Sequence, residues 1–165
     1  MLGRGQGVFY LLATGLIGLV LVTLERLPTV VASHFDAAGA PNGWSRRPAY
    51  ALLLVAIGIL LPVGITVFIR MLSRHGPTGL NIPARDYWTQ PEHGSEAVRR
   101  VRAYVWWLGC IMASTAILIH LLVLDAHRHE PPRLSNSGIL LVLGAALLGV
   151  IGWTAGWYRL LQRPK

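Results

Sequence analysis

The histidines of two short polar stretches, and one carboxylate beside them, are the residues in this sequence whose types can support chemistry. His34 and Asp36 lie two positions apart, and His127 and His129 repeat that spacing further along the chain. His120 is the only histidine within a long apolar segment. Imidazole nitrogens and carboxylate oxygens are ligands for zinc and copper(II). The pattern therefore predicts a candidate zinc or copper site formed by His34, Asp36, His120, His127 and His129.

The same residues also fit a site without metal. Loop histidines are commonly solvated, and a histidine inside a helix needs only a carbonyl or hydroxyl partner. In an extended stretch His34 and Asp36 point the same way, because side chains alternate with period two. These two residues, with Trp44 holding their loop at the membrane surface, are therefore our candidate contact site for a ligand or partner. His120 stays a functional candidate because ionisable groups inside membranes are costly.

Catalytic patterns are missing from the sequence. There is no nucleophile with an adjacent base, no glycine-rich phosphate loop and no pair of acids. The sequence therefore predicts a protein that is not an enzyme.

Four apolar segments must position these polar stretches. The chain is 53% hydrophobic and 13% charged, with a mean hydropathy of +0.51, and each segment is long enough to cross a bilayer as a helix. The prediction is an all-α integral membrane protein, a compact four-helix bundle in one domain. The expected spans are about 8–26, 49–70, 104–125 and 138–158, joined by an outer loop 27–48, a cytoplasmic loop 71–103 and an outer loop 126–137.

The basic residues predict the orientation. Of the 15 Lys and Arg residues, ten lie in the N-terminal, middle and C-terminal polar stretches: Arg4, Arg70, Arg74, Arg85, Arg99, Arg100, Arg102, Arg159, Arg163 and Lys165. The other five lie in the two remaining loops: Arg26, Arg46, Arg47, Arg128 and Arg133. The positive-inside rule then places both termini in the cytoplasm. The net charge of +8 is explained by the membrane, and no basic patch interleaved with aromatics indicates nucleic acid.

The first segment has an alternative interpretation as a cleaved signal peptide, since Arg4 precedes an apolar run and Ala32 is small. The run from Val8 to Leu24 exceeds the usual length of such a region, and Glu25, Arg26 and Pro28 separate it from a cleavage site. A retained anchor is preferred.

Small residues and a proline predict how the helices pack. Pro62 lacks an N–H, which frees a carbonyl near Gly58 and bends the second span. The lone Cys110 is expected to act as a small apolar residue, because no second cysteine exists. Small residues four apart mark contact faces in membranes, and the fourth span carries such a packing face at Ala145, Gly149, Gly152 and Gly156.

Local patterns predict the shape of two connecting loops. Asn42-Gly43 favours a tight turn in the outer loop. In the cytoplasmic loop, Thr89-Gln-Pro-Glu92 is typical of a capping box, which predicts a short helix that lies at the membrane surface before the third span.

Several of these motifs together resemble a known family, the domain of unknown function 1648, which forms the N-terminal module of SdpI-type immunity membrane proteins. The resemblance covers most of residues 8–110. It rests on Leu27-Pro28, His34-Phe35, Gly39, Pro41, Gly43-Trp44, Asn81-Ile-Pro83, Asp86-Tyr-Trp88 and Pro91-Glu92.

The resemblance implies a multi-pass protein of the bacterial cytoplasmic membrane that takes part in immunity or signalling. Our leading functional prediction is a non-enzymatic protein that binds a ligand or partner through the outer loop. The alternative is an accessory subunit of a larger membrane complex or enzyme, holding zinc or copper at its outer histidines. Expected partners are the bilayer and another membrane protein or a second copy of the chain.

Overall fold

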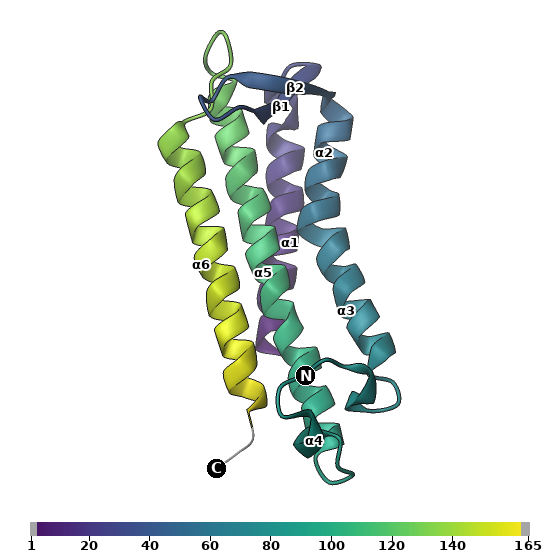
Figure 1. Ribbon diagram of the computed structural model, residues 1–165. Coiled ribbons are helices and arrows are strands. Elements are labelled where there is room, and N and C mark those ends of the chain that lie inside the picture. Colours follow the sequence, from purple (N-terminus) through teal and green to yellow (C-terminus); the bar gives the residue numbers. More distant parts are fainter. Residues whose placement is uncertain (1–2, 163–165) are drawn as a thin grey trace.

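Four long helices run side by side, and a small β-hairpin lies across one end of them (Figure 1). The computed structural model describes residues 3–162, and 72% of the chain is helical. The elements in order are α1 (Arg4–Thr23), η1 (Leu24–Arg26), β1 (Val30–Phe35), β2 (Pro41–Arg46), α2 (Arg47–Val55), η2 (Ala56–Leu60), α3 (Leu61–Leu72), η3 (Pro77–Gly79), α4 (Arg85–Trp88), α5 (Gly94–Ala126) and α6 (Asn136–Leu161).

Four helical units are long and apolar enough to cross a membrane. They cover Arg4–Arg26, Arg47–Leu72, Gly94–Ala126 and Asn136–Leu161. Each contains one predicted span, so the prediction of four helices long and apolar enough to cross a membrane is confirmed. Both described ends of the chain lie away from the hairpin, and we call this the terminal end of the molecule (Figure 1). Arg163 and Lys165, two of the basic residues counted at this end, lie outside the described residues.

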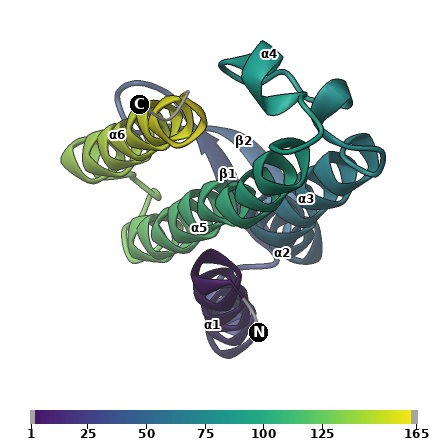
Figure 2. The same cartoon turned by 90° about the horizontal axis from the view of Figure 1, so that it is seen from below.

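The helices are arranged around α5 rather than as a closed ring of four (Figure 2). α1, α3, η2 and α6 each pack on α5, whereas α1 contacts α2 only slightly. Small buried residues of α5, namely Gly109, Ala113 and Ala116, allow this close approach. α6 is peripheral, since only 6% of its most apolar 18-residue stretch is buried. The predicted compact bundle is therefore more open on the α6 side than expected.

The second span is interrupted where Pro62 predicts a bend. A π-helical turn, η2, connects α2 to α3, and Pro62 lies at the start of α3. α3 runs at an angle to α2 (Figure 1). Gly58 lies within this turn, and a Cβ there would be 2.6 Å from Leu16 of α1 and 2.9 Å from Ala116 of α5. The irregular turn thus brings the backbone of the second span against both neighbours.

The segment 27–48 is not an irregular loop, because β1 and β2 form an antiparallel hairpin. The class is therefore mostly helical with a two-stranded sheet, and the all-α prediction is wrong in this detail. The turn also differs from the prediction, since Asn42-Gly43 lies inside β2. The chain reverses at Asp36–Ala40, where Gly39 has a φ of 77° and Asp36 closes the turn. Asp36 and Gly39 thus have the roles in the turn that the sequence suggested for Asn42 and Gly43, since Asp, Asn and Gly are all common turn residues.

The predicted short surface helix is not a separate element. α5 is continuous from Gly94 to Ala126, because the sequence after Gly94 has no Gly or Pro before the apolar part begins. The capping box is not formed, since the Thr89 hydroxyl donates to the carbonyl of Arg85. Trp88 instead organises the segment before α5. Its indole is 1% exposed and donates to the carbonyl of Leu161 at 2.7 Å, which ties this segment to the end of α6.

Candidate functional site

The hairpin is held down on the helix ends by buried side chains of its first strand. Val31 and Ala32 are fully buried, and Val31 belongs to the same apolar cluster as Leu27, Tyr50 and Val123. Two successive buried positions break the alternation expected of a simple strand, and the register shifts between Ala32 and His34. Because of this irregularity, two adjacent residues of β1 are both buried against the helices.

His127, just after α5, fastens the outer edge of β1. Its Nε2 accepts a hydrogen bond from the backbone N–H of Ala32 at 3.1 Å. Its Nδ1 lies 2.8 Å from the carbonyl oxygen of Val123, one turn back along α5. Because a carbonyl only accepts, Nδ1 carries the proton and the ring is neutral in this arrangement. Both ring nitrogens of His127 are thus used for structure.

The tip of the hairpin is fixed by the loop between α5 and α6. The backbone N–H of Leu134 donates to the carbonyl of Gly39 at 2.9 Å. A Cβ at Gly39 would come within 2.8 Å of Asn136 Oδ1 and closer still to the Leu134 carbonyl. Only glycine combines this close approach with a positive φ without strain. The hairpin is therefore attached at its strand edge and at its tip.

Asp36 has a structural task in this tip. Its Oδ1 accepts hydrogen bonds from the backbone N–H groups of Ala38 and Ala40, both at 2.9 Å. This is the Asx-type turn that Asp commonly forms. Asp36 lies beyond the end of β1, after a second register shift. The predicted pairing of His34 and Asp36 on one face therefore does not follow from strand alternation.

His34 and Trp44 are exposed residues of the hairpin, and they lie on opposite faces of it, because His34 is paired with Gly43 and adjacent residues of a strand point to opposite faces. The Trp44 side chain is 53% exposed, and His34 is exposed with its Nδ1 3.2 Å from the hydroxyl of Ser33. His34 pairs with Gly43, where a Cβ would lie 2.9 Å from the His34 Cβ. Asn42 and Arg46 are also exposed, as expected for alternate residues of β2. We call these five residues, which belong to both faces of the hairpin, the hairpin surface: His34, Asn42, Gly43, Trp44 and Arg46.

His120 lies below the hairpin, fully buried, and joins three helices. Its Nδ1 is 3.0 Å from the Tyr50 hydroxyl of α2, and its Nε2 is 2.8 Å from the Thr23 hydroxyl of α1. Thr23 itself donates to the carbonyl of Leu19 at 2.6 Å. Because the Thr23 hydroxyl has used its proton, it accepts a hydrogen bond from Nε2 of His120. Nδ1 of the neutral ring then accepts a hydrogen bond from the Tyr50 hydroxyl. Every polar atom of this buried network is satisfied.

The sequence carries a signal for this network in the depths of three polar residues along their spans. Thr23 and Tyr50 are polar residues at the same end of the first two spans, at the depth of His120 in the third. A polar group within hydrocarbon needs a partner from another helix or from its own backbone. Matching polar residues at equal depth would have predicted the contact.

The five candidate metal ligands are not brought together. Among residues 3–162, no group of three or more His, Cys, Asp or Glu side chains is arranged to hold a metal ion. His120 and His127 use both ring nitrogens in hydrogen bonds, and Asp36 uses its carboxylate in the turn. The remaining two candidates, His34 and His129, do not make a site alone. The candidate zinc or copper site therefore finds no support in the structure.

The small residues of α6 contact α5, line an open groove or, at Gly149, do both. A Cβ at Gly149 would contact Ile111 of α5 at 3.4 Å, and Gly156 lies directly against Tyr104. Gly152 has open space beside it, and Ala145 and Gly152 line a groove at the surface of the helices. The predicted packing face is therefore shared between contact with α5 and an open groove. Cys110 is buried, with its thiol 3.5 Å from the carbonyl of Gly5.

Comparison with protein families agrees with the resemblance found in the motifs. Residues 11–60 match the family described as Domain of unknown function (DUF1648). The match begins within α1, includes the whole hairpin and α2, and ends at the last residue of η2. No curated protein and no solved structure matches the chain significantly.

Proposed function

We propose that this chain is a non-enzymatic protein of the bacterial cytoplasmic membrane that binds a ligand or partner through the hairpin surface, in an immunity or signalling role of the SdpI type. The observation that carries the proposal is the combination of a firmly attached hairpin with exposed His34 and Trp44 side chains. A rigid support lowers the entropy lost when a partner binds. Tryptophan is also one of the residue types enriched among those that contribute most to the free energy of binding at protein interfaces.

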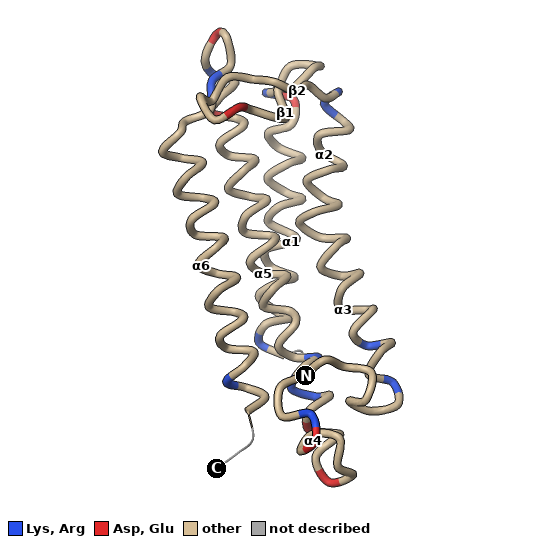
Figure 3. Tube along the Cα trace, viewed as in Figure 1, with Lys and Arg blue, Asp and Glu red and all other residues tan. Residues whose placement is uncertain are grey.

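The proposed orientation places the hairpin surface outside the cytoplasm. Basic residues are concentrated at the terminal end, where Figure 3 shows most of the Lys and Arg positions of the chain. The positive-inside rule assigns such an end to the cytoplasm. The polar first turns of α5, residues 94–103, then lie at the level of the inner headgroups.

Fusions to reporter enzymes test the orientation. A periplasmic reporter joined after Gly39 should be active, and the same reporter joined after Lys165 should be inactive. The opposite pattern would show that the hairpin faces the cytoplasm.

Crosslinking in intact cells tests the binding role. A photo-reactive residue at Asn42, on the hairpin surface, should give a discrete adduct, which should be lost when Trp44→Ala or His34→Ala is added. Tyr158→Ala is a matched control, because Tyr158 is an aromatic side chain of α6 that is 56% exposed at the other end of the molecule. If no adduct forms, and the cells keep their phenotype when Trp44 and His34 are replaced, the hairpin is a structural cap only.

The alternative function, an accessory subunit of a larger complex, stays a prediction. The identity of the adduct separates the two possibilities. A secreted peptide or small ligand supports the immunity role, and a stable integral membrane protein supports the subunit role.

A further inference from the structure

Two adjoining cavities open on the face of the molecule between α1 and α6. One is a groove of about 680 Å³ along α5, and the other is a pocket of about 450 Å³ at the terminal end. Tyr104 and Trp107 line both, so the groove and the pocket are continuous. Neither includes a residue of the hairpin surface, so the pair is a feature separate from the proposed partner site.

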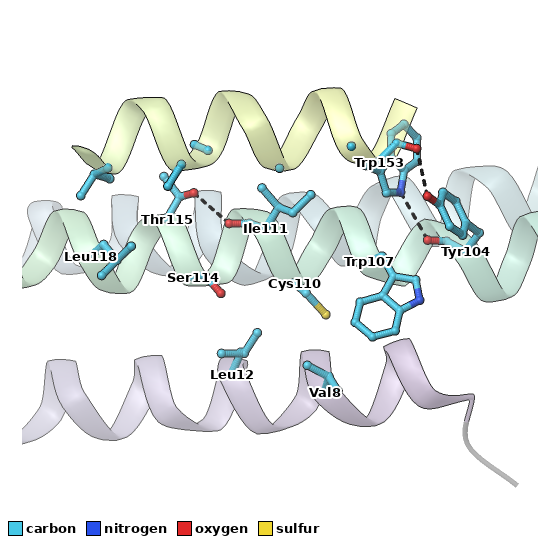
Figure 4. A pocket seen from close by; sticks show the side chains of 15 residues that line it. Val8, Leu12, Tyr104, Trp107, Cys110, Ile111, Ser114, Thr115, Leu118 and Trp153 are labelled. Atoms are coloured by element: carbon cyan, nitrogen blue, oxygen red, sulfur yellow. Dashed lines mark hydrogen bonds between the residues drawn. The ribbon is translucent and has the colours of Figure 1, made fainter. Parts of the chain in front are cut away.

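The groove has the dimensions and lining of a site for an apolar chain. Figure 4 shows α5 as its floor, with Val8 and Leu12 of α1 on one side and α6 on the other. Small residues of α6, including Ala145 and Gly152, keep it open. It runs from Tyr104 to Leu118, and 14 helical residues span about 21 Å. This length exceeds half of a hydrocarbon core of about 30 Å.

Aromatic groups close the groove at its polar end. The Tyr104 hydroxyl donates to the carbonyl of Trp153 at 3.0 Å, and the Trp153 indole donates to the carbonyl of Tyr104 at 3.4 Å. Figure 4 shows these two bonds beside Trp107. Tryptophan and tyrosine prefer the headgroup level of a bilayer. The boundary between groove and pocket is therefore at the depth where a lipid changes from acyl chain to headgroup.

The pocket beyond this boundary is basic. Arg4, Arg99 and Arg100 line it, and within residues 3–162 Glu96 is the one carboxylate that pairs with any of them. Arg100 is committed to the protein, because it also donates to the carbonyl of Leu160 at 3.0 Å. Arg99 keeps a side chain that is 76% exposed. Arg4 is exposed, and its side chain forms no hydrogen bond or ion pair within residues 3–162.

We infer that this face binds one anionic phospholipid, with its phosphate in the pocket of Arg4 and Arg99 and an acyl chain in the groove beside Gly152. The excess of guanidinium groups over carboxylates complements a negative headgroup. The continuous apolar groove complements the chain attached to it. Basic pockets between helices at the cytoplasmic side of membranes are recognised sites for such lipids.

Native mass spectrometry of the full chain in neutral detergent tests the inference, with phosphatidylglycerol and phosphatidylcholine of identical acyl chains as probes. One phosphatidylglycerol per chain should be retained, at least tenfold more tightly than phosphatidylcholine. The double variant Arg4→Gln and Arg99→Gln should bind phosphatidylglycerol roughly 30-fold more weakly, as expected for two surface arginines. The control pair Arg70→Gln and Arg74→Gln removes the same charge from exposed positions at the same end and should bind as the parent does.

The groove is tested separately at α6. Gly152→Leu should weaken binding of both lipids fivefold or more, because its side chain extends into the groove, where Gly152 now has open space. Gly144→Leu is the control, since Gly144 is equally open but does not line the groove. Circular dichroism verifies that each variant stays folded. Equal retention of the two lipids, or equal effects of the two arginine pairs, would overturn the inference. So would a lipid-free dimer that Gly152→Leu dissociates, because a second copy would then occupy the groove.

Discussion

Removing the Tyr50 hydroxyl should destabilise the protein only while His120 is present. In the parent, Tyr50→Phe leaves Nδ1 of a fully buried imidazole without its donor at 3.0 Å, while the ring of Tyr50 keeps its packing. Such a loss costs about 1 kcal/mol of unfolding free energy, since hydrogen bonds between membrane helices contribute about 0.6 kcal/mol on average and at most about 1.7 kcal/mol. In a His120→Leu background, the Tyr50 hydroxyl is itself buried without that partner. There, Tyr50→Phe should be neutral or stabilising.

Four proteins are compared: the parent, Tyr50→Phe, His120→Leu and the double variant. The free energy of unfolding of each can be measured in mild detergent by titration with sodium dodecyl sulfate, with circular dichroism as the signal. Tyr158→Phe serves as the control, because this exposed hydroxyl should contribute less than about 0.5 kcal/mol. An equal cost of Tyr50→Phe with and without His120 would refute the hydrogen bond between these two side chains. The same result would reopen His120 as a residue with a function other than joining helices.

Three glycine positions give further predictions. Gly58→Ala should cost about 1–3 kcal/mol of unfolding free energy because its Cβ would overlap neighbouring helices, whereas Gly64→Ala, in open space, should be tolerated; equal effects would contradict the packing around the π turn. Gly39→Ala should lower the free energy of unfolding by about 1–2 kcal/mol, because alanine is strained at this positive φ. A protease should then cut the hairpin earlier than the helices. An unchanged cleavage pattern would contradict the attachment of the hairpin tip. Gly156→Leu should displace α6 and lower the midpoint of thermal unfolding, whereas Gly152→Leu should not; similar midpoints would show that the two glycines share one environment.

The helical part of the fold follows from the sequence because its signal is long and uniform. Twenty or more apolar residues without charge have few stable forms in hydrocarbon other than a helix. The bend at Pro62 was also predictable, since a missing N–H has a local consequence. The central place of α5 was not, because all four spans carry small residues and the pattern alone does not say which helices meet.

The hairpin illustrates the opposite case. Its strands are only six residues long, and β1 has two buried residues in succession, so no clear alternation indicates a strand. What holds β1 in place is a bond from Ala32 to His127, 95 positions away. A contact of this kind depends on how α5 ends above the hairpin. The sequence therefore indicates which segment carries the candidate site, whereas the structural tasks of Asp36 and His127 are visible only in three dimensions.

The central position of α5 also affects the order in which the molecule is completed during synthesis. The segment that matches the family, residues 11–60, contains α1, the hairpin and α2. Much of the surface that these elements bury is covered by α5, and the fastening of β1 comes from His127. When the ribosome has made only the first two spans, these helices lie in the bilayer with few native neighbours, and the hairpin has no attachment at its edge. We therefore expect the stretch that carries the sequence similarity to reach its final shape only after α5, a helix outside that stretch, has been made.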